Sequence, residues 1–257
     1  MAQPYSARSR AIEPFHVMAL LARANELQAA GHDVIHLEIG EPDFTTAAPI
    51  IAAGQAALAD GKTRYTAARG LPQLREAISG FYAQRYQVDI DPERILVTPG
   101  GSGALLLTSS LLVDPGKHWL LADPGYPCNR HFLRLVEGGA QLVPVGPQQR
   151  YQLTPELVEQ CWNDDSVGAL VASPANPTGT LLHRDELAAL SQTLKARNGH
   201  LVVDEIYHGL TYGMDASSVL EVDDDAFVLN SFSKYFGMTG WRLGWLVAPA
   251  DAVGDLE

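Results

Sequence analysis

The chain has 257 residues, of which 46% are hydrophobic and 19% are charged, enough to bury a full core in an ordinary globular protein. Its net charge of −12 argues against nucleic acid or an anionic membrane as the main partner, although a local cluster of donors can still bind a small anion. Two cysteines without metal-like spacing, no apolar stretch of about 20 residues and no secretory signal predict no metal site, no membrane span and a cytoplasmic location.

Strand-like segments begin after a short N-terminal arm and an expected helix at 16–30. Most of them are continuous apolar runs bounded by glycine and proline, a pattern typical of strands buried on both faces of a sheet. The predicted strands are 34–39, 95–98, 119–122, 142–145, 169–172, 201–204, 227–230 and 243–247.

Helical patterns alternate with these strands. Thr154 and Pro155 provide a cap and a first-turn proline for one of them, and Gly199 stands where a C-cap glycine belongs in another. The alternation predicts an α/β fold with a mostly parallel central sheet flanked by helices. The predicted helices are 71–86, 104–112, 157–162 and 184–198.

Polar residues directly follow five of the predicted strands. In open parallel sheets, ligands bind beyond the carboxyl ends of the strands, so these residues are expected to meet at one edge. They are Gly100, Gly101 and Ser102, then Tyr126, then Asn176, then Asp204 with Tyr207, and finally Ser231 to Lys234.

Lys234 follows a buried strand, whereas the other three lysines lie in turn or polar-helix contexts typical of solvated charge. Partial burial beside other cations lowers an amine pKa, as covalent catalysis requires, but a lone lysine at a strand end is more often a surface charge. Arg242 stands among aromatic and aliphatic residues, where it needs an anionic partner. That partner is either an acidic side chain or a phosphate group.

The other polar groups each have a structural and a functional interpretation. The glycines at 100–103 form either a tight turn or an anion cradle ahead of a helix. Asp204 either caps a turn or keeps the nitrogen of a heteroaromatic ring protonated, and Tyr207 either packs or donates to the oxygen of that ring. Asn176 stabilises a turn or is aimed at a ligand, and Tyr126 packs or stacks on a flat ligand.

Jointly these motifs resemble the class I/II aminotransferases, the fold-type-I pyridoxal-phosphate (PLP) family typified by aspartate aminotransferase. The match runs through nearly the whole chain in family order. The matching motifs lie at 38–44 (Glu-Ile-Gly-Glu-Pro-Asp-Phe), 65–71, 100–103, 174–179, 204–207 and 231–234, with Arg242 after them.

The resemblance implies a catalytic set of Lys234, Asp204 and Tyr207. Lys234 would hold PLP as a Schiff base and then carry a proton between the substrate α-carbon and the cofactor. Asp204 would pair with the pyridine nitrogen, and Asn176 and Tyr207 with the ring oxygen. Tyr126 would stack on the ring face.

The resemblance also implies which residues would contact the phosphate and the substrate. Tyr65 would reach the phosphate of the neighbouring subunit's cofactor, which implies a homodimer. Gly40 and Asn176 would contact the substrate. The phosphate would be held by Gly101, Ser102, Ser231, Ser233 and Arg242.

Members of this family continue well past the position that matches residue 257. We therefore expect a fragment: an N-terminal arm and helix over 1–40, a large PLP-binding domain over 41–250, and the start of a helix over 251–257. The small C-terminal domain would be largely missing, together with the family's carboxylate-binding arginine. On this view the chain alone would be unstable or inactive.

The expected activity is transfer of an amino group from an α-amino acid to a 2-oxo acid. Three alternatives remain open. A C–S lyase or decarboxylase on the same scaffold would keep every cofactor residue, and an inactive fragment would keep them without function. The ligand-sensing domain of a PLP-type regulator would need an attached basic DNA-binding domain.

Overall fold

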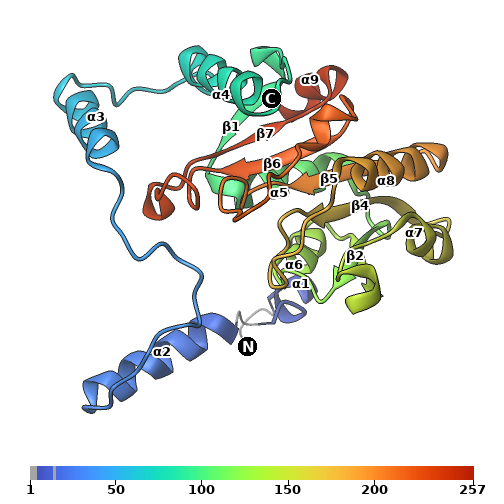
Figure 1. Cartoon of the computed structure of the whole chain (residues 1–257), viewed down its shortest axis with the longest axis horizontal. Helices are drawn as coiled ribbons and strands as arrows, with labels where there is room; N and C mark the ends of the chain where they lie inside the picture. Colours follow the sequence, from blue (N-terminus) through green and yellow to red (C-terminus); the bar gives the residue numbers. More distant parts are fainter. Residues whose placement is uncertain (1–4, 14–15) are drawn as a thin grey trace.

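The computed structural model describes residues 5–13 and 16–257, and its centre is a seven-stranded sheet in the order β1-β7-β6-β5-β4-β2-β3 (Figure 1). Neighbouring strands are parallel except that β7 is antiparallel to both β1 and β6. The predicted, largely parallel sheet is confirmed, with one reversed strand. The strands are β1 (Ile95–Thr98), β2 (His118–Asp123), β3 (Gly139–Pro144), β4 (Ser166–Ala172), β5 (His200–Asp204), β6 (Phe227–Ser231) and β7 (Gly244–Val247).

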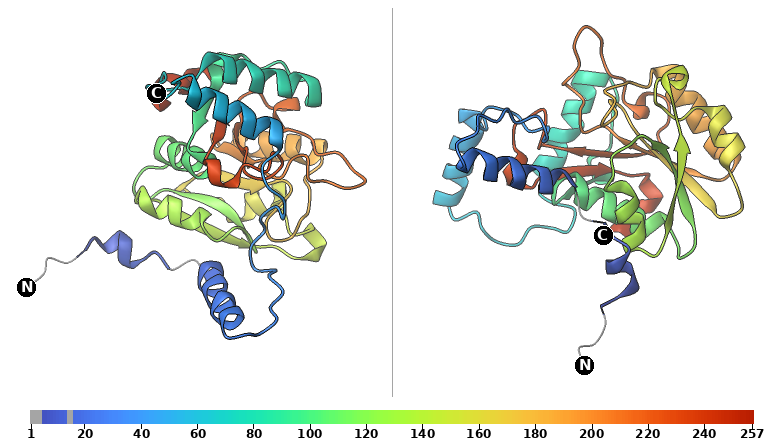
Figure 2. Two further views of the ribbon diagram at one scale, coloured as in Figure 1. Left: turned by 90° about the vertical axis from the view of Figure 1, so that its left-hand side faces the viewer. Right: turned by 90° about the horizontal axis from the view of Figure 1, so that it is seen from below.

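Helices cover both faces of this sheet (Figure 2). One face packs against α4 (Pro72–Tyr86), α7 (Pro155–Cys161) and α8 (Arg184–Ala196). The other packs against α5 (Gly100–Leu112), α6 (Asn129–Leu135) and α9 (Val253–Leu256). Successive strand residues alternate between the two cores: Leu120 belongs to the first, and its neighbours Trp119 and Leu121 to the second. Short 3-10 helices lie at Pro92–Arg94, Pro147–Gln149, Val219–Glu221, Thr239–Trp241 and Ala250–Ala252.

The predicted helix signals are confirmed at α7 and corrected at α8. The Thr154 hydroxyl accepts a hydrogen bond from the Leu157 amide at the start of α7, and Pro155 occupies the first turn. At the end of α8 the left-handed residue is Asn198, with φ of 55°, and not Gly199. Gly199 is glycine for a steric reason, because a Cβ there would lie 2.3 Å from the ring of Trp162.

The predicted strand at 34–39 is wrong. These residues pair with no strand of the described chain, and Ile35 and Leu37 are 82% and 88% exposed. The reason is their position, because the chain from α2 (His16–Ala29) to α3 (Ala48–Ala59) lies beside the sheet and buries no residue in either helix (Figure 1). A further short helix, α1 (Ala7–Arg10), precedes them, and no helix within 5–13 and 16–257 has the length and apolar character to span a bilayer.

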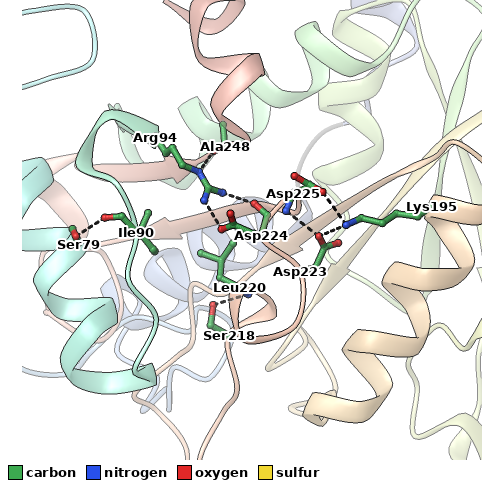
Figure 3. Close-up of polar contacts among 10 residues, drawn as sticks. All are labelled: Ser79, Ile90, Arg94, Lys195, Ser218, Leu220, Asp223, Asp224, Asp225 and Ala248. Atoms are coloured by element: carbon green, nitrogen blue, oxygen red, sulfur yellow. Dashed lines mark hydrogen bonds and ion pairs between the residues drawn. The ribbon is translucent and has the colours of Figure 1, made fainter.

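The connection from β5 to β6 ends in a firmly held segment, 218–225 (Figure 3). Arg94 is 8% exposed and binds both the Asp224 side chain and the Ala248 carbonyl. Lys195 on α8 binds the carboxylates of Asp223 at 2.6 Å and Asp225 at 3.0 Å. The segment is thus tied through Arg94 to the 3-10 helix that precedes β1, and through Lys195 to α8.

We expect Gly199→Ala to lower the free energy of unfolding by about 1–3 kcal/mol, because Trp162 must move to admit the new methyl group. Gly80→Ala is the matched control: Gly80 lies inside α4 with open space around its Cβ position, so alanine should stabilise by about 0.5–1 kcal/mol. Urea titration of both variants measures the difference. Equal midpoints would contradict the steric argument.

Candidate active site

A cavity of about 540 Å³ lies at the carboxyl edge of the sheet. It is lined by residues that follow β1, β2, β4, β5 and β6, as the strand-edge argument predicts. Of the predicted site residues, those that line it are Gly40, Gly101, Ser102, Tyr126, Asn176, Asp204, Tyr207, Ser233, Lys234 and Arg242.

One end of the cavity is rich in hydrogen-bond donors. The expected glycine loop is part of a helix, since α5 begins at Gly100, which has φ of 73°. The amides of this first turn have no partner within the helix, and Gly101 and Ser102 line this end of the cavity. Ser231 lies just behind the lining, and its hydroxyl donates to the Ser233 hydroxyl at 2.8 Å.

Arg242 completes this donor cluster. It precedes β7 in a left-handed conformation, with φ of 53°, and its Nη1 donates to the Thr239 carbonyl at 2.9 Å. No carboxylate of the described residues lies within ion-pair distance of Arg242, so the acidic-partner interpretation does not hold there. A Cβ at Gly100 would lie 2.5 Å from Nη2 of Arg242, so a side chain at 100 would displace the guanidinium.

Lys234 lines the cavity and is half-buried. Its Nζ donates to the Gly40 carbonyl at 2.7 Å and lies 6.0 Å from the centre of the Tyr207 ring. Burial lowers the pKa of the Lys234 amine and Arg242 lowers it further, while Glu41 opposes the shift. The amine is therefore easier to deprotonate than that of a solvated lysine.

Asp204 ends β5 with its carboxylate toward the cavity. Its Oδ1 accepts a hydrogen bond from the Ile206 amide at 3.0 Å, and no cationic side chain of the described structure pairs with it. Burial raises the pKa of Asp204 to about 6. Asn176 Nδ2 donates to the Tyr207 hydroxyl at 3.4 Å, and burial, with Asp204 nearby, raises the pKa of Tyr207.

The turn that carries Asn176 is braced by residues outside the predicted set. Gln152 is 3% exposed, and its Nε2 donates to the carbonyls of Ala172 at 3.1 Å and Thr180 at 3.0 Å, which lie on either side of the turn. Both X-Pro bonds of the segment, before Pro174 and Pro177, are cis. Sequence reasoning missed Gln152, because a glutamine in a polar stretch carries no signal of burial.

Tyr65 does not line the cavity in the described structure. Its side chain is fully exposed, on the stretch between α3 and α4. Glu205 is the second residue that sequence reasoning missed. It directly follows Asp204 and is completely buried.

The lining fits PLP in its chemistry. A phosphate requires clustered donors and positive charge, a pyridine nitrogen requires an acid, and an aldehyde requires an amine. The α5 amides with Arg242, the unpaired carboxyl of Asp204 and the amine of Lys234 meet these needs around a single cavity. No cluster of His, Cys, Asp or Glu among the described residues has the composition of a metal site.

Comparison with known proteins places the chain in a family. Residues 32–257 match the model of aminotransferase class I and II. The chain is 39% identical over 240 residues to valine–pyruvate aminotransferase of Mycobacterium tuberculosis, covering 93% of this chain and 62% of that one. It is 34% identical over 251 residues to aspartate aminotransferase of Geobacillus stearothermophilus, covering 96% and 64%.

Solved structures agree. An aminotransferase from Mycobacterium tuberculosis superposes with a TM-score of 0.95 at 37% identity, covering 99% of this chain and 66% of that one. The Thermus thermophilus aspartate aminotransferase with maleate gives a TM-score of 0.94 at 32% identity. The chain thus spans about two thirds of the length of these relatives. It belongs to the class I and II aminotransferases, a family whose members use PLP.

Proposed function

We propose that this chain carries the cofactor centre of an aminotransferase that moves an amino group from an α-amino acid to a 2-oxo acid. The observation that carries the proposal is the placement of a half-buried lysine amine and an unpaired buried carboxyl on one cavity, with an arginine and a helix N-terminus at its donor-rich end. Bound PLP would supply an electron-withdrawing ring that disperses charge from the substrate α-carbon.

In this proposal the donor-rich end anchors the phosphate. Amides of Gly101 and Ser102 donate at the start of α5, where the helix dipole favours an anion. Ser231 and Ser233 add hydroxyls, and Arg242 adds a fixed positive charge. Anchoring at one end holds the ring in a single orientation through both halves of the reaction.

Asp204 would keep the ring nitrogen protonated. Its pKa of about 6 without a cationic partner reflects the cost of burying its charge, and a cationic ring nitrogen would lower that cost. Asn176 and Tyr207, already hydrogen-bonded to each other, would donate to the ring oxygen, and Tyr126 would stack on the ring face.

Lys234 would attach the cofactor and would also serve as the general base. Its lowered pKa leaves more of the amine unprotonated near neutral pH, which both roles require. As the base, the amine would carry a proton between the substrate α-carbon and the cofactor. Gly40, whose carbonyl contacts Nζ, then lies where it can meet the substrate together with Asn176.

Amino-group transfer is favoured over the C–S lyase alternative by the relatives, which carry aminotransferase names. The division into 1–40, 41–250 and 251–257 remains a prediction, and so does the location in the cytoplasm. A homodimer is proposed because Tyr65 is fully exposed, as a residue that serves the partner's cofactor must be before assembly.

We expect Lys234→Ala to abolish covalent attachment of PLP. The purified chain is mixed with PLP, treated with borohydride and mapped by peptide mass; the label should appear on Lys234 and vanish in the variant. Lys62→Ala is the control, since Lys62 is solvent-exposed and does not line the cavity. Labelling of Lys62 or Lys195 in place of Lys234 would refute the assignment.

Adding amino acids to the loaded chain tests the reaction class. A shift of the cofactor absorbance with formation of the matching 2-oxo acid supports amino-group transfer. Release of ammonia and pyruvate from cystathionine would indicate a lyase in its place.

We expect Asp204→Asn to stabilise the cofactor-free chain by about 3 kcal/mol at pH 8. The folded pKa of Asp204 is raised from 3.8 to about 6, so ionisation favours the unfolded state as the pH rises through this window. Below pH 4 both states are protonated and the gain should disappear. Urea unfolding at pH 3.5 and pH 8 measures it; the same gain at both pH values would contradict the burial argument.

The proposed contribution of Tyr65 to the partner subunit's site can be tested by combining two defective variants. Tyr65→Ala should weaken PLP binding about tenfold, the size expected for one lost hydrogen bond to a charged group. When Tyr65→Ala and Lys234→Ala chains are mixed and allowed to exchange subunits, hybrid dimers regain one complete site and hence tight binding. No recovery in a mixture shown to form hybrid dimers would rule out the role of Tyr65.

A further inference from the structure

Glu205 is a completely buried carboxyl next to Asp204, and the proposed reaction gives it no role. Its Oε1 accepts two hydrogen bonds from the 218–225 segment, one from the Ser218 hydroxyl at 2.9 Å and one from the Val219 amide at 2.9 Å. Ser218 and Val219 follow Glu205 by 13 and 14 positions, so these contacts join two separate parts of the chain. Both donors converge on one oxygen, so the side chain is held in one orientation.

The segment that Glu205 contacts is itself fixed from two other directions. Arg94 and Lys195 hold its far end, Asp223 to Asp225 (Figure 3). Its near end is capped, because the Ser218 hydroxyl accepts from the Leu220 amide, and Glu221 accepts from the Ser218 amide at 2.8 Å. The 218–225 segment therefore serves as a rigid support for Glu205.

On its other side Glu205 belongs to the turn that presents the site residues. The Glu205 amide donates to the Leu229 carbonyl at 2.9 Å, and the His208 amide closes the turn on the Glu205 carbonyl at 2.9 Å. Asp204 and Tyr207 lie within this turn and face the cavity, whereas the Glu205 side chain points into the core. A shift of Glu205 would move both cavity residues.

The surroundings of Glu205 favour its neutral form. Its Oε2 has no hydrogen-bond partner in the described structure, which would be costly for an ionised carboxylate. The nearest basic group, His208 Nδ1, lies 3.6 Å away and 2.7 Å from the Tyr86 hydroxyl. Burial lowers the pKa of His208 to about 4 and raises that of Glu205 to about 8, so burial favours the neutral form of both groups.

We propose that Glu205 is a positioning residue: its carboxyl ties the 204–208 turn to the 218–225 segment and so sets where Asp204 and Tyr207 face the cofactor. The effect on the cofactor rests on the proposed function, whereas the hydrogen-bonded tie does not. Of the two adjacent carboxyls, Asp204 faces the cavity and Glu205 fixes the geometry of the turn.

The test uses two substitutions at one position. In Glu205→Gln the amide oxygen still accepts from Ser218 and Val219, and no charge is added or lost if the acid is neutral. In Glu205→Ala both hydrogen bonds disappear. Ser79→Ala is the control, because it removes one side-chain hydrogen bond, to the Ile90 carbonyl at 2.6 Å, that involves neither the turn nor the 218–225 segment (Figure 3).

The first measurement is hydrogen–deuterium exchange of peptides covering 204–210 in the chain without PLP. We expect Glu205→Ala to exchange about tenfold faster there, the effect of losing hydrogen bonds to a buried group. Glu205→Gln and Ser79→Ala should match the parent chain. Unchanged exchange in Glu205→Ala, or loss of protection in Glu205→Gln, would overturn the inference.

The second measurement is the dissociation constant of PLP, which should rise about tenfold in Glu205→Ala and stay near the parent value in Glu205→Gln and Ser79→Ala. The two measurements separate the two proposals. If exchange follows the expected pattern but the parent chain takes up no PLP, the tie stands and the proposed function fails. If PLP binds but its dissociation constant is unchanged in Glu205→Ala, the positioning role fails.

Discussion

The site depends on one reversed strand. In a purely parallel sheet, only residues that follow strands reach the carboxyl edge. Because β7 runs antiparallel between β1 and β6, the residue before it reaches that edge too, which brings Arg242 beside Gly100. Gly244 makes the arrangement possible, since a Cβ there would lie 2.6 Å from the Gly100 carbonyl carbon and 2.8 Å from the Asn230 oxygen. A close approach of three backbones thus underlies the donor cluster.

The groups that this edge collects are unfavourable for folding by themselves. Burial raises the pKa of Asp204 and lowers that of Lys234, so burial disfavours the charged form of each side chain. The sheet offsets this, because its strands are buried on both faces; every residue of β6 and β7 is buried. The two apolar cores stabilise the fold and offset the cost of burying Asp204 and Lys234 at the cavity. A ligand of complementary charge at this edge would lower that cost.

Much of this arrangement could be predicted from the sequence, because apolar runs and the residues that follow them are local signals. The α/β fold and the convergence of Asp204, Asn176 and Lys234 on one cavity follow from that pattern. The sequence-based predictions failed where contacts between distant parts of the chain determine the structure. The 34–39 segment has a strand-like composition but no neighbouring strand to pair with. Glu205 looks like any acidic residue after a strand, and only the fold shows that Ser218 meets it in the core.

Lys234 also joins the exposed N-terminal part of the chain to the sheet. Its Nζ holds the Gly40 carbonyl, and six residues later Thr46 donates to the Gly237 carbonyl at 2.7 Å and accepts from Trp241. The largely exposed 40–46 segment is therefore held by the loop after β6. The proposed attachment of a cofactor to Lys234 would therefore require its nitrogen to release the Gly40 carbonyl, so one atom would link the cofactor site to the cavity wall at Gly40.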